Sequence, residues 1–377
     1  MSGSALLWAA LNLRLAASPG LRRRLNARAA DPAAPLSLPQ SAGEFLGPGW
    51  QEEAAAELER ARRFGAGVLT LADEAYPSLL RAAADPPPLL YVWGRLLRQD
   101  ALAVAVVGSR RATPHGSGVA RRLAEGLAGA GFTVVSGLAR GIDAEGHRGA
   151  LECGGRTLAV LGSGLDRIYP VEHQKLAAAI SGQGAVLTEF PFGTGPLPRH
   201  FPERNRVIAW LSWATVVVEA ARDSGSLITA DLAADEGRAV YAVPGPVGCA
   251  ESEGTNALLR QGAIVCRGAE DLLEDLAPQL VEAARLCAPA GRDGDAEPGE
   301  GGAAGSLSGI GSDAARRGLT ADQRRLLERL PKTRGVGVER LAEVSGLPPG
   351  ALLSTLLELE VLGLVRQLPG LRFMASG

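Results

Sequence analysis

Short apolar runs alternate with longer amphipathic stretches through the middle of the chain. The run Ala103–Val107 holds five small apolar residues in succession, which is typical of a buried parallel strand. After Pro114, apolar residues at helical spacing predict a helix over Gly116–Ala130. Repetition of this unit predicts a doubly wound, parallel-rich α/β sheet with helices on both faces. The predicted strands are Ala103–Val107, Thr133–Val135, Thr157–Leu161, Ala185–Glu189, Thr215–Glu219, Ala239–Val243 and Ala263–Cys266, with Leu90–Gly94 joining the same sheet.

The two ends of the chain carry a helical pattern instead. Apolar spacing at Ala5–Ala17 and Trp50–Phe64 predicts a small helical domain over residues 1–70, ahead of an extended Rossmann-like domain over 71–280. Residues 286–318 are rich in Gly, Ala, Ser and Asp, which is typical of a flexible linker. Residues 319–377 have a winged-helix outline. Its predicted elements are helices at Thr320–Leu330, Val338–Val344 and Pro349–Leu362 and strands at Leu364–Arg366 and Leu371–Met374.

The overall charge does not indicate a nucleic-acid-binding protein. The net charge is −2 and the pI is about 6.2, so any basic surface has to be local. Lysine occurs only at Lys175 and Lys332, so nearly all of the 39 basic residues are arginine. The cysteines Cys153, Cys249, Cys266 and Cys287 form no CxxC pair, which argues against a structural metal. Without a signal peptide or a membrane-length apolar run, we expect a cytoplasmic protein with reduced thiols, no membrane contact and no cofactor.

The strand Ala103–Val107 ends at a turn that favours an anion. Gly108 and Ser109 precede Arg110 and Arg111, and a helix follows, so backbone amides, a helix N-terminus and two guanidinium groups meet at one point. The turn is not a P-loop, because no Gly-Lys-Ser/Thr follows, and it lacks the spaced glycines of a dinucleotide-binding loop. A phosphate site without a nucleotide motif indicates a phosphate polymer.

A second basic segment brings arginines close to an aromatic ring. Arg199 lies beside Phe201, and Arg204 and Arg206 follow shortly after. Phosphate neutralisation next to a stacking ring is what single-stranded nucleic acid requires, although Phe201 as a buried anchor of the loop is an open alternative. The Ser-Gly-Ser turn that includes Ser226 is a further anion-favouring helix start.

Other polar residues near the strand ends have a structural interpretation. For Glu219 we expect an ion pair with an arginine rather than the role of a general base, because no nucleophile or metal set accompanies it. Asp143 is expected to cap the helix that follows it. The four histidines are expected to be surface or capping residues; they are His115, His147, His173 and His200.

Six spaced motifs together resemble the bacterial DNA-processing protein A (DprA/Smf) family, over about residues 70–275. They are Gly108-Ser109-Arg110, Ser136–Asp143, Leu161–Asp166 with Tyr169-Pro170, Phe201–Arg206, Ser224–Ala230 and Val243-Pro244-Gly245. The sequence departs from the family pattern at four positions. His173 replaces an Asn, Gly146 an Ala and Trp210 a small residue, and Arg199 is the nearest basic residue to the position of a common lysine.

The resemblance implies a non-enzymatic protein of natural transformation. Such a protein binds incoming single-stranded DNA, protects it from nucleases, loads the RecA recombinase onto it and forms a homodimer through the Rossmann-like domain. It also implies a helical domain like a sterile alpha motif at the N-terminus and a winged helix at the C-terminus. By motif position, the Gly108–Arg110 turn holds phosphate and Phe201 meets a base. The expected DNA-binding residues are Gly108, Ser109, Arg110, Arg111, Arg140, Arg199, Phe201, Arg204, Arg206 and Ser226.

Two other functions are left open by the residues themselves. One is a Rossmann-type nucleotide-processing enzyme of the nucleoside monophosphate hydrolase kind. Glu219 and the Ser224–Ala230 turn are weakly similar to the site of such enzymes, but the Pro-Gly-Gly-x-Gly-Thr loop is missing. The other is a winged-helix transcription regulator. Against it, the segment Ala351–Glu360 has no Lys or Arg and two Glu, whereas a helix that reads a DNA groove needs donor side chains. The dimer and RecA contacts cannot be read from the sequence.

Overall fold

The computed structural model describes two compact units, Met1–Glu270 and Asp271–Gly377. The residues it describes are 3–17, 46–276, 319–331, 336–337, 364–368 and 372–375, with the single positions 341, 345, 352, 355, 356 and 359. Of the predicted segments, the linker at 286–318 lies outside these residues, and the helices at Val338–Val344 and Pro349–Leu362 lie largely outside them. The predicted domain boundaries stay predictions.

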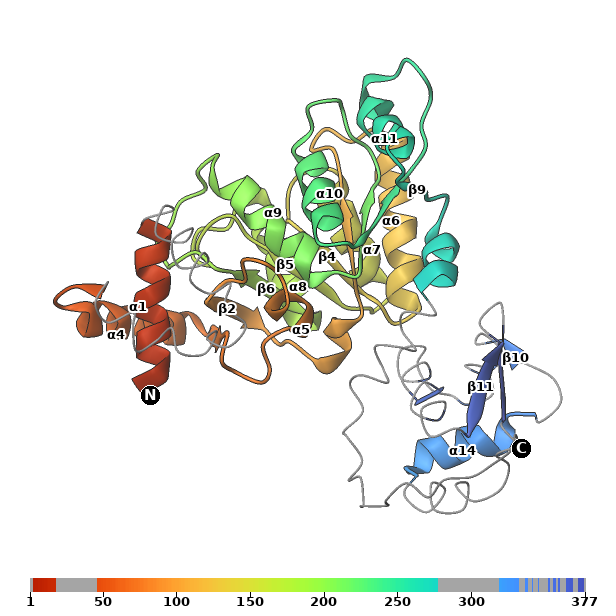
Figure 1. The fold of residues 1–377 in the computed structure, drawn as a ribbon, viewed down its shortest axis with the longest axis horizontal. Coiled ribbons are helices and arrows are strands. Elements are labelled where there is room, and N and C mark those ends of the chain that lie inside the picture. Colours follow the sequence, from red (N-terminus) through yellow and green to blue (C-terminus); the bar gives the residue numbers. More distant parts are fainter. Residues whose placement is uncertain are drawn as a thin grey trace, which may run out of the picture. The chain divides into compact units, whose positions relative to one another are not determined.

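The first unit is built on one nine-stranded sheet with the order β1-β2-β6-β5-β4-β3-β7-β8-β9. Figure 1 shows part of this sheet with helices around it. All strands from β3 to β9 run parallel to their neighbours among these seven. β2 pairs with β6 in the antiparallel direction, and β1 pairs with β2 in the same way. The strands are β1 Gly67–Thr70, β2 Leu89–Gly94, β3 Ala103–Val107, β4 Thr133–Ser136, β5 Thr157–Val160, β6 Ala185–Thr188, β7 Ala214–Val217, β8 Ala239–Ala242 and β9 Ile264–Val265. All eight predicted strands are confirmed within one or two residues at their ends, whereas β1 was missed.

The order of the strands reverses at β3. After β3 the chain moves outward through β4 and β5 to β6, and it then returns to place β7 on the other side of β3. Val104 accordingly pairs with Val134 on one side and with Ala214 on the other. In a parallel sheet this reversal separates the two loops that leave the neighbouring strands, and it opens a crevice beyond their carboxyl ends.

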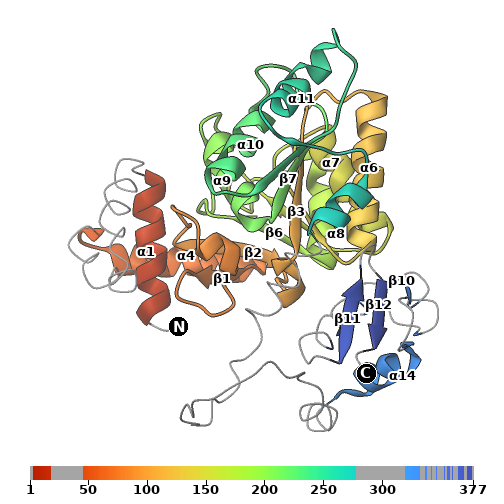
Figure 2. The same ribbon diagram turned by 45° about the vertical axis from the view of Figure 1, so that its right-hand side comes forward.

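Helices cover both faces of the sheet, as predicted. Helices α6, α7 and α8 lie on one face and α9 and α10 on the other (Figure 2). Alternate residues of β3 pack against the helices on opposite faces, because successive side chains of a strand point to opposite faces of the sheet. The helices of this region are α5 Ser78–Arg81, α6 Pro114–Gly129, α7 Ile142–Glu152, α8 Gln174–Gln183, α9 His200–Leu211, α10 Gly225–Asp235 and α11 Ala250–Arg260, with short 3₁₀ turns η1 Arg98–Ala101 and η2 Val171–His173.

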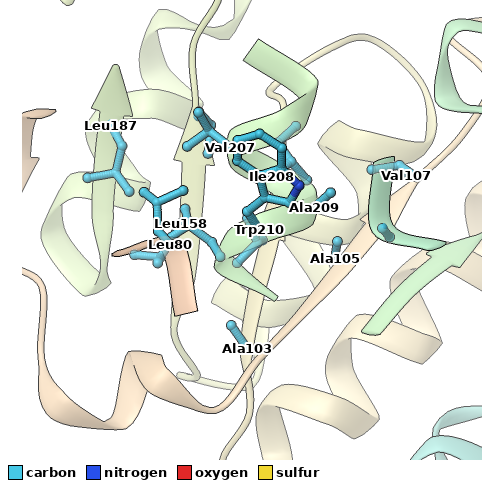
Figure 3. Close-up of a cluster of buried hydrophobic side chains, with 14 of the residues drawn as sticks. Leu80, Ala103, Ala105, Val107, Leu158, Leu187, Val207, Ile208, Ala209 and Trp210 are labelled. Carbon is cyan, nitrogen blue, oxygen red and sulfur yellow. The ribbon is translucent and has the colours of Figure 1, made fainter. Parts of the chain in front are cut away.

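The inner side of α9 fixes that helix on the sheet. Val207, Ile208 and Trp210 pack against the small side chains of β3 and against leucines of β5 and β6 (Figure 3). Ala103 and Ala105 are fully buried beneath it. Each apolar side chain buried in this way contributes on the order of 1.5–3 kcal/mol. The start of α9 is therefore held firmly at the carboxyl edge of the sheet.

Two N-terminal helices, α1 Gly3–Ala17 and α4 Trp50–Phe64, pack together beside β2 and on the same face as α8. Their common core includes Trp8 and Leu58 together with Tyr91 of β2 and Ile180 of α8. The periodicity predicted both helices, and α4 has the predicted limits. Their packing against the sheet makes them part of the first compact unit.

The C-terminal unit contains a three-stranded antiparallel sheet with the order β10-β12-β11. Helix α14, Ala321–Arg329, begins with a capping box between Thr320 and Gln323. Leucines of the helical segments pack around Phe373 of β12. The strands are β10 Val336–Gly337, β11 Val365–Leu368 and β12 Arg372–Ala375. The first predicted helix and the predicted hairpin are confirmed, and β10 was missed.

Candidate nucleic-acid interface

A cavity of about 630 Å³ opens at the carboxyl end of β3, at the point where the strand order reverses. Three segments that are distant in the sequence form most of its wall, and Tyr169 closes one side. The loop after β3 contributes Gly108, Ser109, Arg110 and Arg111; the start of α9 contributes Phe201, Arg204 and Asn205; the start of α10 contributes Ser224, Gly225 and Ser226.

The loop after β3 is rigid because its backbone is bonded to neighbouring segments. The Ser109 amide donates to the carbonyl of Glu219 at 2.7 Å, and the Ser109 carbonyl accepts from Ile142 at 3.2 Å. Gly108 is required here, since a Cβ at this position would lie 2.7 Å from Ile142 Cγ1 and 2.8 Å from the Glu219 carbonyl oxygen. The side chains of Arg110 and Arg111, in contrast, are exposed. The loop therefore presents two cations from a fixed backbone.

The N-terminus of α6 does not face an external anion. The Glu219 carboxylate accepts from the Thr113 amide at 2.9 Å and from the Thr113 hydroxyl at 2.5 Å, and Thr113 Oγ1 accepts from the Gly116 amide at 3.0 Å. The protein thus supplies its own anion to this helix end. The sequence interpretation was wrong at two points, because Glu219 pairs with Thr113 rather than with an arginine, and because the helix that follows the Gly108 turn is already capped.

The N-terminus of α10 faces the cavity. Ser224 caps this helix, with its hydroxyl oxygen 3.4 Å from the Ser226 amide and 2.8 Å from the Ser226 hydroxyl. Asn205 of α9 donates to the Gly225 carbonyl at 3.1 Å and holds the two helix starts together. Because a helix N-terminus carries a partial positive charge, this end adds to the field of Arg110 and Arg111.

An arginine and two aromatic rings lie next to one another along the wall of the cavity. The Arg110 guanidinium lies 5.0 Å from the centre of the Phe201 ring, and the ring centroids of Phe201 and Tyr169 are 5.7 Å apart. Gly162 lies behind Phe201 and leaves space for it, since a Cβ there would lie 3.1 Å from the ring. Phe201 is half-buried, and 38% of Tyr169 is exposed. Phe201 is thus both anchored on one side and open to the cavity on the other.

Arg204 lines the cavity, but its guanidinium is committed to the protein. It donates to the carbonyl of Gly137 at 2.6 Å and to that of Val160, and burial lowers its pKa to about 10. Asp143 accepts from the amides of Gly137 and Ala139 at 3.0 and 3.4 Å, and burial raises the pKa of its carboxyl group. Asp143 therefore fastens the loop before its helix, which corrects the expectation that it caps α7.

Three of the predicted site residues are not brought to the cavity. Arg206 is buried and donates to Glu189 at 2.5 Å and to the Asp85 carbonyl, so its guanidinium is paired within the protein and does not line the cavity. Arg140 is exposed and donates to Glu172 at 2.6 Å. Arg199 is exposed at the start of α9 and does not line the cavity. The seven other predicted residues do lie at the cavity wall.

Three histidines are buried, which corrects the expectation of surface or capping roles. His147 Nδ1 lies 2.7 Å from Thr157 Oγ1, and burial lowers its pKa to about 3. His173 donates to the Leu138 carbonyl at 2.9 Å, and His200 Nδ1 lies 3.2 Å from the Gly195 carbonyl oxygen. Only His115 is exposed among the four. His147 thus joins α7 to β5, while His173 and His200 each contact a backbone carbonyl of a loop.

Sequence reasoning missed Tyr169, Asn205 and Ser224 as parts of the wall. The signal for Tyr169 was the Tyr-Pro pair after the loop of the neighbouring strand, and Asn205 lies between two arginines that were selected. Within the described residues, no three His, Cys, Asp or Glu side chains gather in a way that would hold a metal ion. Nor does any helix of the described chain have the length and apolar character needed to cross a bilayer.

Comparison with known proteins shows the family of this chain. Residues 67–277, which are more than half of the chain, match the family model described as DNA recombination-mediator protein A. The chain belongs to this family. A second model, the DprA winged helix domain, matches residues 311–370, so the C-terminal unit of this DprA-family chain is a winged helix.

Relatives of this DprA-family chain are found in several bacteria. The Smf protein of Escherichia coli is 47% identical over 54% of both chains, and that of Synechocystis is 36% identical over 84% of this chain and 82% of its own length. The crystal structure of DNA processing protein A from Streptococcus pneumoniae covers 60% of this chain and 81% of its own, with a TM-score of 0.53 and 38% identity. A Helicobacter pylori structure covers 56% and 96%, with a TM-score of 0.51 and 31% identity, and its description concerns a single-stranded DNA binding mode. The chain is a member of a DNA-processing family, and the extended Rossmann-like fold is confirmed.

Proposed function

We propose that this protein binds single-stranded DNA in the cavity at the carboxyl end of β3. The observation that supports this most is the cluster of Arg110, Phe201 and Tyr169, which places a cation and exposed ring surface next to one another. A single strand offers phosphates and unpaired bases together, and an aromatic ring stacks on any base. In a duplex the bases are already stacked and paired, so the rings gain nothing from it.

Each wall of the cavity has a separate role in this proposal. Arg110, Arg111 and the N-terminus of α10 attract phosphate groups, while Phe201 and Tyr169 stack on bases. Ser226 supports the helix start through its bond with Ser224. Arg204 and Gly108 act by holding the backbone in place. Arg140 and Arg199 are peripheral, and Arg206 has no contact with the strand.

The proposed function continues beyond binding, in keeping with the family's description as a recombination mediator. The bound strand is protected from nucleases and is handed to a RecA recombinase, and the protein works as a cytoplasmic homodimer through its Rossmann-like domain during natural transformation. No step of catalysis is proposed, and the Glu219 carboxylate, a candidate base, is committed to Thr113. The winged helix is not the main DNA-binding element.

The experiment that tests the binding step is a salt titration of affinity with labelled oligothymidine and with a duplex of equal length. We expect the single strand to bind more tightly at every salt concentration. The slope against salt should fall by about 0.7 for each phosphate contact that a substitution removes. Equal affinity for the duplex at moderate salt would contradict the proposal. Recombinase loading is tested separately, by RecA filament formation on oligothymidine coated with a single-strand-binding protein.

A further inference from the structure

We infer that helices α1 and α4 position the DNA-binding face, through buried hydrogen bonds to the segment that connects β6 to α9. This connector, residues 189–199, leads directly to Phe201. Asn12 and Glu57 are then positioning residues for the bound strand, which rests on the proposed function where DNA affinity is the measurement. Neither residue touches the cavity.

The connector is bonded to the N-terminal helices at two points. Asn12 of α1 donates to the Glu189 carbonyl at 2.9 Å, and the Phe192 amide donates to Glu57 Oε1 of α4 at 2.8 Å. Both polar side chains are buried, with exposed fractions of 1%. A buried carboxylate is costly to hold in place without compensating bonds, and the Phe192 amide supplies one of them, so this bond ties the connector to α4. Arg60 stands 3.3 Å from the other Glu57 oxygen.

Ring contacts reinforce the second of these points. The Phe192 ring packs edge-on against Phe64 of α4 and Tyr91 of β2, with centroid distances of 5.5 and 5.4 Å. The connector thus enters the apolar core that α1 and α4 share with the sheet. Removing the acceptor at Glu57 would leave the Phe192 amide buried without that partner.

The held connector controls the residues that follow it. The Phe190 ring, between the two fixed points, lies 4.5 Å from the His200 ring. His200 immediately precedes Phe201, whose ring lies under the Arg110 guanidinium. Glu189 also accepts from Arg206 of α9 at 2.5 Å. A shift of the connector would therefore reach the base-stacking ring within a few residues, through direct contacts.

The test uses Glu57→Met in the full chain, with Glu59→Met as the matched control. Glu59 is on the same helix but on its exposed side, where it pairs with Arg62 and Arg63. We expect Glu57→Met to weaken oligothymidine binding about three- to tenfold at a temperature where both variants are folded. Glu57→Gln keeps an oxygen acceptor and should restore most of the affinity. Asn12→Leu provides an independent disruption of the other bond.

A double-mutant cycle separates positioning from loss of stability. If Glu57 acts through Phe201, then Glu57→Met should change affinity much less in a Phe201→Ala background. Hydrogen exchange of the free protein gives a readout that needs no DNA: exchange should accelerate at residues 190–201 in Glu57→Met but not in Glu59→Met. Unchanged exchange at these residues, or an equal loss of affinity in both backgrounds, would overturn the inference. Failure of the unmodified protein to bind oligothymidine would instead overturn the proposed function, and hydrogen exchange would still decide the inference.

Discussion

Two regions at the carboxyl edge of the sheet use arginine in opposite ways. The loop after β3 holds Arg110 and Arg111 exposed at the cavity, with Arg110 stacked on an aromatic ring. The inner side of α9 holds Arg204 and Arg206 buried, where their guanidinium groups donate to carbonyl and carboxylate oxygens of the protein itself. A guanidinium that is bonded within the fold has fewer N–H donors left for a direct contact with phosphate. The difference shows that the role of each arginine depends on whether its guanidinium is paired within the protein. The residue type and the local density of arginine do not decide it.

The largest effect in this comparison is expected from Arg206→Met. Removing the cation leaves the Glu189 carboxylate buried without this guanidinium, so the free energy of unfolding should fall by about 3–5 kcal/mol. Chemical denaturation measures the change, and Arg140→Met, at an exposed ion pair, is the control that should leave stability as it was. The folded fraction should keep the salt slope of the unmodified protein. A lower slope would return Arg206 to the DNA-binding residues.

The same distinction explains what the sequence could and could not predict. Apolar periodicity located eight strands of the large sheet because buried strands and helices each impose their own spacing on the apolar residues. The site residues near Gly108 and Phe201 were found because their motifs lie at strand ends and helix starts. The burial of Arg206 was not foreseen, because its partner Glu189 lies on another strand-end loop and only the fold brings the two together. Glu219 was misread for the same reason, since Thr113 is distant in the sequence.

Small edge strands were missed for a different reason. β1 has four residues and pairs with the next strand, β2, while β10 has two residues and pairs with β12. Only Thr70 of β1 is buried, whereas β4, β5, β6 and β7 are buried at all four positions, so β1 lacks the fully buried apolar run that marked the other strands. The burial of three histidines was also missed. A buried imidazole needs only one carbonyl or hydroxyl oxygen as its partner, and His147 and His173 find theirs 10 and 35 residues away, where no local motif indicates it.

Phe201→Ala tests the exposed side of the comparison, with the next largest expected effect. Loss of the ring should weaken single-strand binding by about 1–3 kcal/mol for each base that stacks on it. The Arg110 guanidinium also loses its support, so the two side chains should be coupled. Affinity for oligothymidine in a cycle with Arg110→Gln measures this coupling.

Phe201→Leu is the control for packing at the same position. It keeps an apolar side chain beside Gly162 but removes the ring, so it should show the binding loss with little change in melting temperature. The salt slope should change by less than one phosphate contact in either variant, because stacking displaces no counterion. A large drop in melting temperature for Phe201→Leu, with a changed slope, would make Phe201 an anchor of the loop instead.

Arg110→Gln and Arg111→Gln should act on the salt dependence rather than on stability. Each variant removes an exposed cation at the cavity, so the slope of affinity against salt should fall by about 0.7 for each phosphate group that is no longer neutralised. In a homodimer with both sites on one strand the fall would be about twice as large. Melting temperatures should stay close to that of the unmodified protein. A slope that does not change in either variant would contradict the assignment of this loop to phosphate.

The smallest effect is expected at Arg199, where the comparison can be sharpened most. Arg199 is exposed like Arg110, yet it does not line the cavity, so exposure alone does not make it a phosphate contact. Arg199→Gln should leave the slope unchanged, and Arg199→Glu should weaken binding only at low salt. A charge that acts through the long-range field is screened beyond about 10 Å at 0.1 M salt, whereas a direct contact still adds its own counterion release to the slope. The slopes of the two variants, compared with that of Arg110→Gln, measure this directly. If Arg199→Gln lowers the slope by as much as Arg110→Gln does, the strand extends over the start of α9 and the bound region is larger than the cavity.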